Sequence, residues 1–253
     1  MTLVKTVLDA IDRFAPFDTC VEGDSVGLLV GSADAEVRRV AIALDVTSNT
    51  VMQARAAGCD LLVTHHPAYF GLLEEQPEDS AAALAQKLGL CIISAHTNLD
   101  AARGGVNDLL ADLLGIKNVE AIGIEGEPLP MARVGDLKME SAASLAAFAG
   151  KRLGVGGVKF TECSDAISRV AVCGGSGGDF LIAAKNAGAQ ALVTGESKHH
   201  LRLLARELDV ALIECGHFCT EQPIKKTLAD IIASCSADIL LLDERDPAEY
   251  IKL

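Results

Sequence analysis

The feature that most constrains the fold is a sequence pattern that occurs twice, the second copy 130 positions after the first. Arg39-Val40-Ala41 returns as Arg169-Val170-Ala171, and Leu62-Val63-Thr64 returns as Leu192-Val193-Thr194. In both copies, short apolar runs alternate with segments of helical periodicity. This alternation is typical of parallel strands joined by crossover helices, with helices covering both faces of the sheet. The repeat therefore predicts an α/β protein with two related lobes.

A cluster of glycine and proline residues marks the predicted boundary between the lobes. Gly123, Gly126, Pro128 and Pro130 lie in a linker-like stretch over residues 118–136. We therefore predict a first α/β lobe over residues 1–125 and a second over residues 126–253. An exchange of segments between the lobes is compatible with this boundary.

Charge and hydropathy exclude several classes of partner. The formal net charge is −13, and no group of Lys and Arg residues is dense enough to neutralise several phosphates, so we expect no nucleic-acid partner. No apolar run reaches the roughly 18 residues that a membrane span requires, so we expect no membrane partner. The start of the chain lacks the pattern of a signal peptide, and the eight cysteines lack CxxC spacing. We therefore expect a cytoplasmic protein.

Two adjacent histidines end one of the repeated apolar runs. Leu61–Thr64 is followed by His65, His66 and Pro67. On a continuing strand the two imidazoles would point to opposite faces, but Pro67 interrupts the ladder of hydrogen bonds, which lets both point into one pocket. Such a pair alone is more often a surface pair than a pair of metal ligands.

A second histidine pattern recurs in both lobes and strengthens the metal hypothesis. His96 precedes Asp100 by four positions, as His217 precedes Glu221, and each pair follows a predicted strand. Ligands of parallel α/β sheets gather at the carboxyl ends of strands. All six histidines follow such strands, namely His65, His66, His96, His199, His200 and His217.

The combined set of donors exceeds the needs of a single tetrahedral zinc ion. Three histidines and two carboxylates fit two divalent metal ions, and the ligands we predict are His65, His66, Asp100, His217 and Glu221. Mixed nitrogen and oxygen donors suit Zn, Mn, Fe, Co or Ni. A rival site is a thiolate zinc centre at Cys215-x-His217-x-Cys219, although the equivalent segment around His96 contains no sulfur, which favours structural thiols.

Two further motifs of the second lobe leave alternatives open. Residues 174–178 include four glycines and form either a phosphate-binding turn or a tight turn between a strand and a helix. Glu196 occupies the position equivalent to His66. Together with His199 and His200 it supplies either groups for proton transfer or substrate binding, or solvated residues at the start of a helix.

Several of these motifs, in this order, resemble the family of NIF-three-like dinuclear-metal proteins, often described as GTP cyclohydrolase 1 type 2 homologues. The resemblance spans nearly the whole chain and rests on Asp24–Gly31, Thr64–Pro67, Ala95–Asp100, Gly104–Asp108, Gly174–Gly177, Thr194–Glu196 with His199 and His200, and Gly216 and His217 with Glu221. One departure is Glu196, where the family commonly has Asp; the charge is the same and only the reach differs.

The resemblance implies a fold, an assembly and an activity. The family fold consists of two similar α/β lobes around a metal-binding cleft, assembled into homohexamers, and its metal pair is held by residues that match the five predicted ligands. The family name implies hydrolysis of a small-molecule substrate, the guanine ring of the nucleotide GTP, by metal-activated water. His96, Glu196 and His200 are then the candidates for proton transfer.

Two other functions remain compatible with the sequence. The first is a dinuclear phosphoesterase or amidohydrolase that acts on another small substrate. The second is a non-catalytic metal-binding protein whose hexameric scaffold is the functional object.

Overall fold

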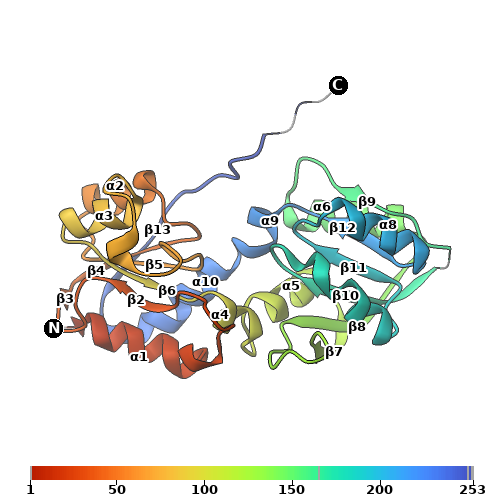
Figure 1. Cartoon of the computed structure of the whole chain (residues 1–253), viewed down its shortest axis with the longest axis horizontal. Coiled ribbons are helices and arrows are strands. Elements are labelled where there is room, and N and C mark those ends of the chain that lie inside the picture. Colours follow the sequence, from red (N-terminus) through yellow and green to blue (C-terminus); the bar gives the residue numbers. More distant parts are fainter. Residues whose placement is uncertain (1, 165, 250, 252–253) are drawn as a thin grey trace. The chain divides into compact units, whose positions relative to one another are not determined.

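The chain folds into two compact units, shown in the computed structural model, which describes residues 2–164, 166–249 and 251 (Figure 1). Unit 1 comprises Met1–Ala102 and Ile224–Glu244, and unit 2 comprises Arg103–Pro223 and Arg245–Leu253. Each unit is a mixed α/β structure in which helices cover a central sheet, so the predicted fold class is confirmed.

Unit 1 is built on a five-stranded sheet with the order β13-β4-β5-β6-β2. The first four of these strands run parallel, whereas β2 pairs with β6 in the antiparallel direction. Two short strands, β1 and β3, form a separate antiparallel pair. The bounds are β1 (Thr2–Leu3), β2 (Gly27–Val30), β3 (Glu36–Val37), β4 (Arg39–Ala43), β5 (Leu61–Thr64), β6 (Cys91–Ser94) and β13 (Asp238–Leu241).

Helices cover the apolar strands of unit 1 because those strands have no polar face to expose. All four residues of β5 and of β6 are buried. Helices α2 and α3 pack against Ala41, Leu62 and Ile92, while α10 contacts both α1 and β4. The helical bounds are α1 (Val4–Phe14), η1 (Phe17–Thr19), α2 (Ser48–Ala56), η2 (Leu73–Glu75), α3 (Ala81–Lys87), α4 (Thr97–Ala101), α10 (Ile224–Ile232) and η4 (Ala233–Cys235).

Side-chain caps set the starts of the two helices that lie between the parallel strands. Thr47 and Thr50 form a reciprocal capping box at the start of α2, with Thr47 Oγ1 accepting from Thr50 N at 3.1 Å. The Ser80 side chain accepts from Ala83 N at the start of α3. These caps satisfy backbone amides that have no partner inside the helix, so they stabilise the starts of α2 and α3.

Unit 2 contains a six-stranded sheet with the order β7-β8-β10-β11-β12-β9. Strands β10, β11 and β12 are parallel, while β8 and β9 pair in the antiparallel direction with β10 and β12. The strand bounds are β7 (Lys117–Ile122), β8 (Ala132–Met139), β9 (Lys159–Phe160), β10 (Ile167–Cys173), β11 (Ala191–Thr194) and β12 (Ala211–Glu214).

Successive side chains of the unit 2 strands enter two separate cores. Val170 and Val193 pack with α5 and α6 on one face, whereas Ala171 and Leu192 pack with α7 and α8 on the other. This alternation follows from the two-residue period of a strand. The helical bounds are α5 (Val106–Leu114), α6 (Ala142–Leu153), η3 (Gly177–Phe180), α7 (Leu181–Asn186), α8 (His199–Glu207) and α9 (His217–Glu221).

The observed division of the chain differs from the predicted boundary after residue 125. Residues 118–136 do not form a linker, because they contain parts of β7 and β8, which pair with each other inside unit 2. The cluster of glycine and proline residues at 123–130 lies in the loop between these two strands. In addition, residues 224–244 return to unit 1, where β13 extends the parallel sheet beside β4.

The internal repeat is visible in equivalent hydrogen bonds at the predicted offset. The Arg39 side chain donates to the Ala57 carbonyl at 2.8 Å, and the Arg169 side chain donates to the Ala187 carbonyl at 3.0 Å. The Asp60 side chain likewise accepts from the Arg39 amide, as the Gln190 side chain accepts from the Arg169 amide. The three parallel strands β4, β5 and β6 therefore correspond to β10, β11 and β12.

None of the helices in the described part of the chain combines the length and the apolar character needed to cross a membrane.

A buried ion pair ties the end of unit 1 to the loop that follows β4. Glu244 Oε2 accepts from Lys225 Nζ at 2.9 Å and from the Leu44 amide at 2.7 Å, while its Oε1 accepts from the Asp45 amide at 3.1 Å. The Lys225 and Glu244 side chains are only 10% and 7% exposed. The carboxylate thus satisfies three donors that burial separates from water.

Replacing Glu244 with Ala should lower the free energy of unfolding by about 3 kcal/mol, because it leaves the Lys225 ammonium buried without its counter-ion. Urea denaturation followed by circular dichroism measures this change. The Lys225→Met/Glu244→Leu double variant should recover only part of the loss, since the Leu44 and Asp45 amides still lack their acceptor.

The matched control is Asp230→Ala, which breaks the exposed Lys226–Asp230 pair on α10. It should change the free energy of unfolding by less than about 1 kcal/mol. Equal unfolding midpoints for Glu244→Ala and the wild type would contradict the role assigned to this carboxylate.

Candidate functional site

The polar residues of unit 1 gather where its parallel strands end. Asp45 follows β4, His65 and His66 follow β5, and His96 follows β6. These strands are neighbours in the sheet, so their carboxyl ends lie along one edge. One ring nitrogen from each of His65, His66 and His96 lies within 4.8 Å of the others. We call these three residues the histidine cluster.

The ring of His65 is fixed by a backbone carbonyl. His65 is fully buried, and its Nδ1 lies 2.8 Å from the Ala95 carbonyl oxygen. Because a carbonyl only accepts, Nδ1 must carry the proton, and the neutral ring then presents a lone pair at Nε2. His65 Nε2 lies 3.5 Å from Asp100 Oδ1, in the short helix α4.

The ring of His66 is fixed by a carboxylate instead. His66 Nδ1 lies 2.7 Å from Asp45 Oδ1. Asp45 belongs to the loop whose amides are held by Glu244, so the ion pair at the end of unit 1 supports the orientation of His66. A carboxylate that accepts from one ring nitrogen fixes the ring and makes the other nitrogen more basic, as is typical of metal-binding histidines.

His96 has the strongest carboxylate partner of the three. Its Nδ1 lies 2.9 Å and 3.0 Å from the two oxygens of Asp24, and Thr97 also donates to this carboxylate. Burial raises the pKa of Asp24, but the hydrogen bonds from His96 and Thr97 outweigh burial and hold this pKa at about 2. Asp24 is therefore ionised near neutral pH, and His96 donates to it from Nδ1.

Unit 2 brings together three more of the predicted residues. His217, at the start of α9, lies after β12, and its Nδ1 is 3.0 Å from Glu196 Oε1, in the loop after β11. Its Nε2 is 3.0 Å from Glu221 Oε2. A neutral imidazole donates from only one nitrogen. Contact with two carboxylates therefore suits either a protonated ring or a cation shared by Nε2 and Glu221.

Hydrogen bonds hold Glu196 as an anion. His217 and Ser176 lower the pKa of Glu196, and the Ser176 hydroxyl donates to its Oε1 at 2.8 Å. Next to it, the Ser197 amide donates to Glu214 Oε1 at 2.7 Å, and Arg202 donates to both Glu214 oxygens. This network fixes the loop that carries Glu196.

The glycine loop after β10 is a close-packed turn. The Gly174 amide donates to Asn107 Oδ1 at 2.7 Å, and the Gly175 amide donates to Thr220 Oγ1 at 3.1 Å. Gly175 has φ +58°, and a Cβ at this position would collide with the carboxylate of Glu221. The turn therefore makes room for Glu221, and its first two amides already have partners, which favours the tight-turn interpretation over phosphate binding.

The sulfur atoms near His217 are structural. Cys215 is fully buried in the core of the α5 and α6 face, and burial raises the pKa of its thiol to about 12. Burial also raises the pKa of the Cys219 thiol. Neutral thiols are poor metal ligands, so this environment argues against a thiolate zinc site.

His199 and His200 differ from the other histidines. Both are exposed at the start of α8. In the part of the chain that the structure describes, no hydrogen bond or ion pair joins His200 to Glu196, His217 or Glu221. The structure therefore brings Glu196, but not His200, into contact with the predicted ligand His217.

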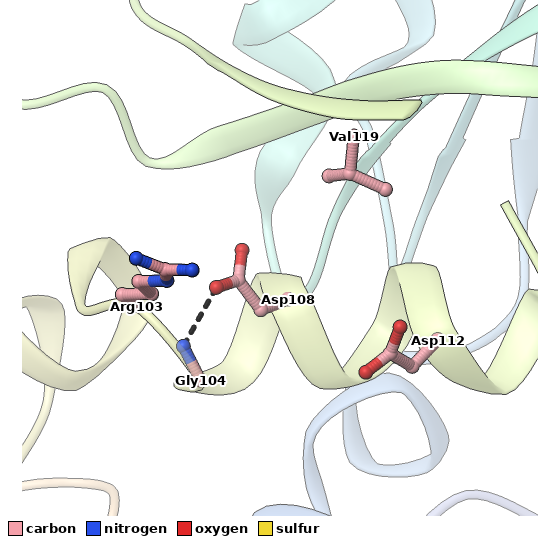
Figure 2. A pocket seen from close by; sticks show the side chains of 5 residues that line it. All are labelled: Arg103, Gly104, Asp108, Asp112 and Val119. Carbon is pink, nitrogen blue, oxygen red and sulfur yellow. Dashed lines mark hydrogen bonds between the residues drawn. The ribbon is translucent and has the colours of Figure 1, made fainter. Parts of the chain in front are cut away.

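Unit 2 also contains a pocket of about 560 Å³ that none of the predicted site residues lines. Figure 2 shows Asp108 and Asp112 one turn apart on α5, facing Val119 of β7. Asp108 Oδ2 accepts from the Gly104 amide at 2.6 Å, and its other oxygen pairs with the buried Arg133. Asp108 therefore has a structural role. The other charged residues that line this pocket are Asp112 and Arg103.

Sequence reasoning did not select Asp24 or Asp45. Asp45 follows β4 as the histidines follow β5 and β6, so the rule that selected the histidines would also have found it. Asp24 gives no comparable signal, because it lies 72 positions before His96 in the chain and only the fold joins them.

The donor set fits divalent metal ions. Two ligands of one tetrahedral ion lie about 3.3 Å apart when each bond is about 2.0 Å long. The Nε2–carboxylate distances of 3.5 Å for His65 with Asp100 and 3.0 Å for His217 with Glu221 are close to this value. In the histidine cluster each Nδ1 atom lies beside an oxygen acceptor, so Nε2 is the nitrogen through which each ring would bind a metal ion.

Comparisons with known proteins agree with this fold. A Clostridium perfringens protein named GTP cyclohydrolase 1 type 2 homolog is 28% identical over 264 residues, covering 98% of this chain and 99% of that protein. The crystal structure of a hypothetical Staphylococcus aureus protein has a TM-score of 0.86 at 25% identity, covering 99% of both chains. Reduced HcgD from Methanocaldococcus jannaschii has a TM-score of 0.77 at 27% identity, covering 96% of this chain and 98% of that one.

One family accounts for nearly the whole sequence. The sequence profile of the family described as Duf34/NIF3 (NGG1p interacting factor 3) matches residues 2–247. That range includes the helices and strands of both α/β units and every residue of the candidate site. The chain therefore belongs to the Duf34/NIF3 family.

Proposed function

We propose that the protein is a metal-dependent hydrolase that opens the guanine ring of GTP. Relatives named GTP cyclohydrolase 1 type 2 homolog support the choice of substrate. The observation that carries the proposal is the pairing of an imidazole Nε2 with a carboxylate at 3.5 Å and 3.0 Å, once in each unit. Nitrogen and carboxylate donors with this spacing are suited to hydrolytic metal ions.

The proposed metal ligands number five, three from unit 1 and two from unit 2: His65, His66, Asp100, His217 and Glu221. We propose two divalent ions per chain, with Zn, Mn, Fe, Co and Ni all compatible with these donors. Such ions, when bound, lower the pKa of water and polarise the bond under attack. The chain contributes the orientation of the three histidine ligands, through Ala95, Asp45 and Glu196.

His96 is the best-placed group for proton transfer in this proposal. The ionised Asp24 accepts from Nδ1, which fixes the ring and leaves Nε2 to take up or release a proton beside the cluster. Glu196 is a weaker base because its pKa is lowered, so its contact with His217 suits orientation of that ring. His200 is a third candidate, exposed on α8, that acts only if the substrate reaches it.

The same donors would also serve a phosphoesterase or an amidohydrolase acting on another small substrate, because they do not select the bond that is broken. A non-catalytic metal-binding scaffold is the other alternative. In either case we propose a homohexamer, on the basis of the family resemblance. We further propose a cytoplasmic location, since all eight cysteines are free thiols, as is typical of reducing compartments.

Metal content provides the first test. The wild-type chain should bind about two divalent ions after reconstitution. His66→Gln, Asp100→Asn and Glu221→Gln should each bind fewer, because each loses a ligand. Asp45→Asn should keep all ligands and yet bind metal roughly 10-fold to 100-fold more weakly, since it removes the partner that orients His66. Elemental analysis and competition with a chelator measure both effects.

Two exposed residues on α8 serve as matched controls for the metal measurements. His199→Gln and Glu207→Gln repeat the chemical changes of His66→Gln and Glu221→Gln outside the candidate site. They should bind as much metal as the wild type. Full metal content in both Asp100→Asn and Glu221→Gln would disprove the assignment of these carboxylates.

Turnover separates the roles of His96 and the ligands. His96→Gln should retain metal but lose about 100-fold or more in the rate of GTP ring opening, because it removes a group that transfers protons. Loss of the guanine absorbance and a gain of one water in the product mass measure the reaction.

Two outcomes would change the proposal. A His96→Gln variant that loses metal would make His96 a ligand and not a proton-transfer group. No turnover of GTP by the metal-loaded wild type, while a phosphoester or amide substrate is hydrolysed, would replace the proposed substrate with one of the alternatives.

A further inference from the structure

An aromatic side chain stands exposed beside the histidine cluster. The side chain of Phe70 is 64% exposed, and its ring centroid lies 6.4 Å from that of His96, with an angle of 64° between the ring planes. An edge contact of this kind covers little of the ring. A broad apolar surface is therefore presented to solvent next to candidate metal ligands.

The backbone that carries Phe70 is anchored on both sides. Before it, Tyr69 packs against the core of the α2 and α3 face and donates its hydroxyl to the Leu29 carbonyl at 2.7 Å. After it, Leu73 packs against the same core. The Gln76 side chain donates to the carbonyls of Phe70 and Leu72, at 3.2 Å and 3.1 Å. Phe70 is thus exposed although its neighbours are held in place.

The charge of the loop that carries Phe70 limits the kind of ligand that the loop can bind. Residues 67–80 contain no Lys or Arg and four acidic residues, so the loop cannot neutralise a phosphate. An uncharged flat ring is not repelled, and it gains contact area by stacking on an aromatic side chain. Single exposed apolar residues are common on protein surfaces. Phe70 differs from such isolated surface residues because its ring contacts the ring of His96 in the histidine cluster.

We propose that Phe70 is a stacking platform for a flat heteroaromatic ring of the substrate, such as a purine base. This inference rests on the proposed function, because it places the ring of the substrate beside the histidine cluster. Phe70 then determines specificity by binding, and it takes no part in proton transfer. The phosphates of a nucleotide must be bound elsewhere.

Binding of guanosine and of ribose 5-phosphate to the metal-loaded full chain tests the proposal, with calorimetry as the measurement. Phe70→Ala should weaken guanosine binding about tenfold, the range typical of losing one stacked base. Phe70→Trp should retain the wild-type affinity, because it keeps an aromatic face. Binding of ribose 5-phosphate, which has no base, should be the same in all three proteins.

Leu72→Ala is the matched control. Leu72 is 60% exposed on the same loop but has no aromatic ring, so its loss should change guanosine affinity by less than about twofold. If this surface instead binds a second copy of the chain, Phe70→Ala and Leu72→Ala would both shift the sedimentation coefficient. That result, or equal guanosine affinities for Phe70→Ala and the wild type, would overturn the proposal.

The outcomes separate this inference from the proposed hydrolase activity. Guanosine binding that depends on Phe70, without turnover of GTP, would support the platform and reject the reaction. Turnover of GTP with unchanged KM in Phe70→Ala would support the reaction and reject the platform. A wild-type protein that binds no guanosine at all would also overturn the platform. If both ideas hold, Phe70→Ala should raise KM about tenfold with little change in kcat.

Discussion

The parallel pairing of short, fully buried strands is the constraint on which the rest of the structure depends. Strands such as β5 and β11 have no polar face, so helices must cover both sides of the sheet and polar residues can enter only where a strand ends. Neighbouring parallel strands end along the same edge. The histidines that follow β5 and β6 in unit 1 therefore lie close together although His96 is 30 positions after His66 in the sequence.

Neighbouring carboxylates then set the orientation of several of these histidine rings. Asp24, Asp45 and Glu196 each contact the Nδ1 atom of a histidine, which fixes the orientation of the ring. The Nε2 atom of that ring is then the one that can bind a metal ion or a proton. In an acidic chain of net charge −13, these carboxylates also favour cations at the strand ends. The excess of negative charge, from which we predict no nucleic-acid partner, is thus consistent with the metal sites that we propose.

Hydrophobic periodicity and helix caps predict local structure in this chain. They do not predict contacts between residues that are distant in the sequence. The alternation of short apolar strands with helices follows from nearby residues, and the α/β fold class that it predicts is confirmed. The β7–β8 hairpin was predicted as a linker, because glycine and proline are common to both. The contact of Asp24 with His96 depends on tertiary packing, which no local pattern reports.

The discontinuity of unit 1 has a consequence for the order in which the protein is made. Helix α10 and strand β13 are translated after all of β7–α9, yet β4 needs β13 as its neighbour and the loop after β4 needs Glu244. During synthesis, the helices and strands of unit 2 emerge while the sheet of unit 1 still lacks an edge strand. The ring of His66 is therefore fully supported only after Glu244 has been synthesised and has reached the loop that carries Asp45.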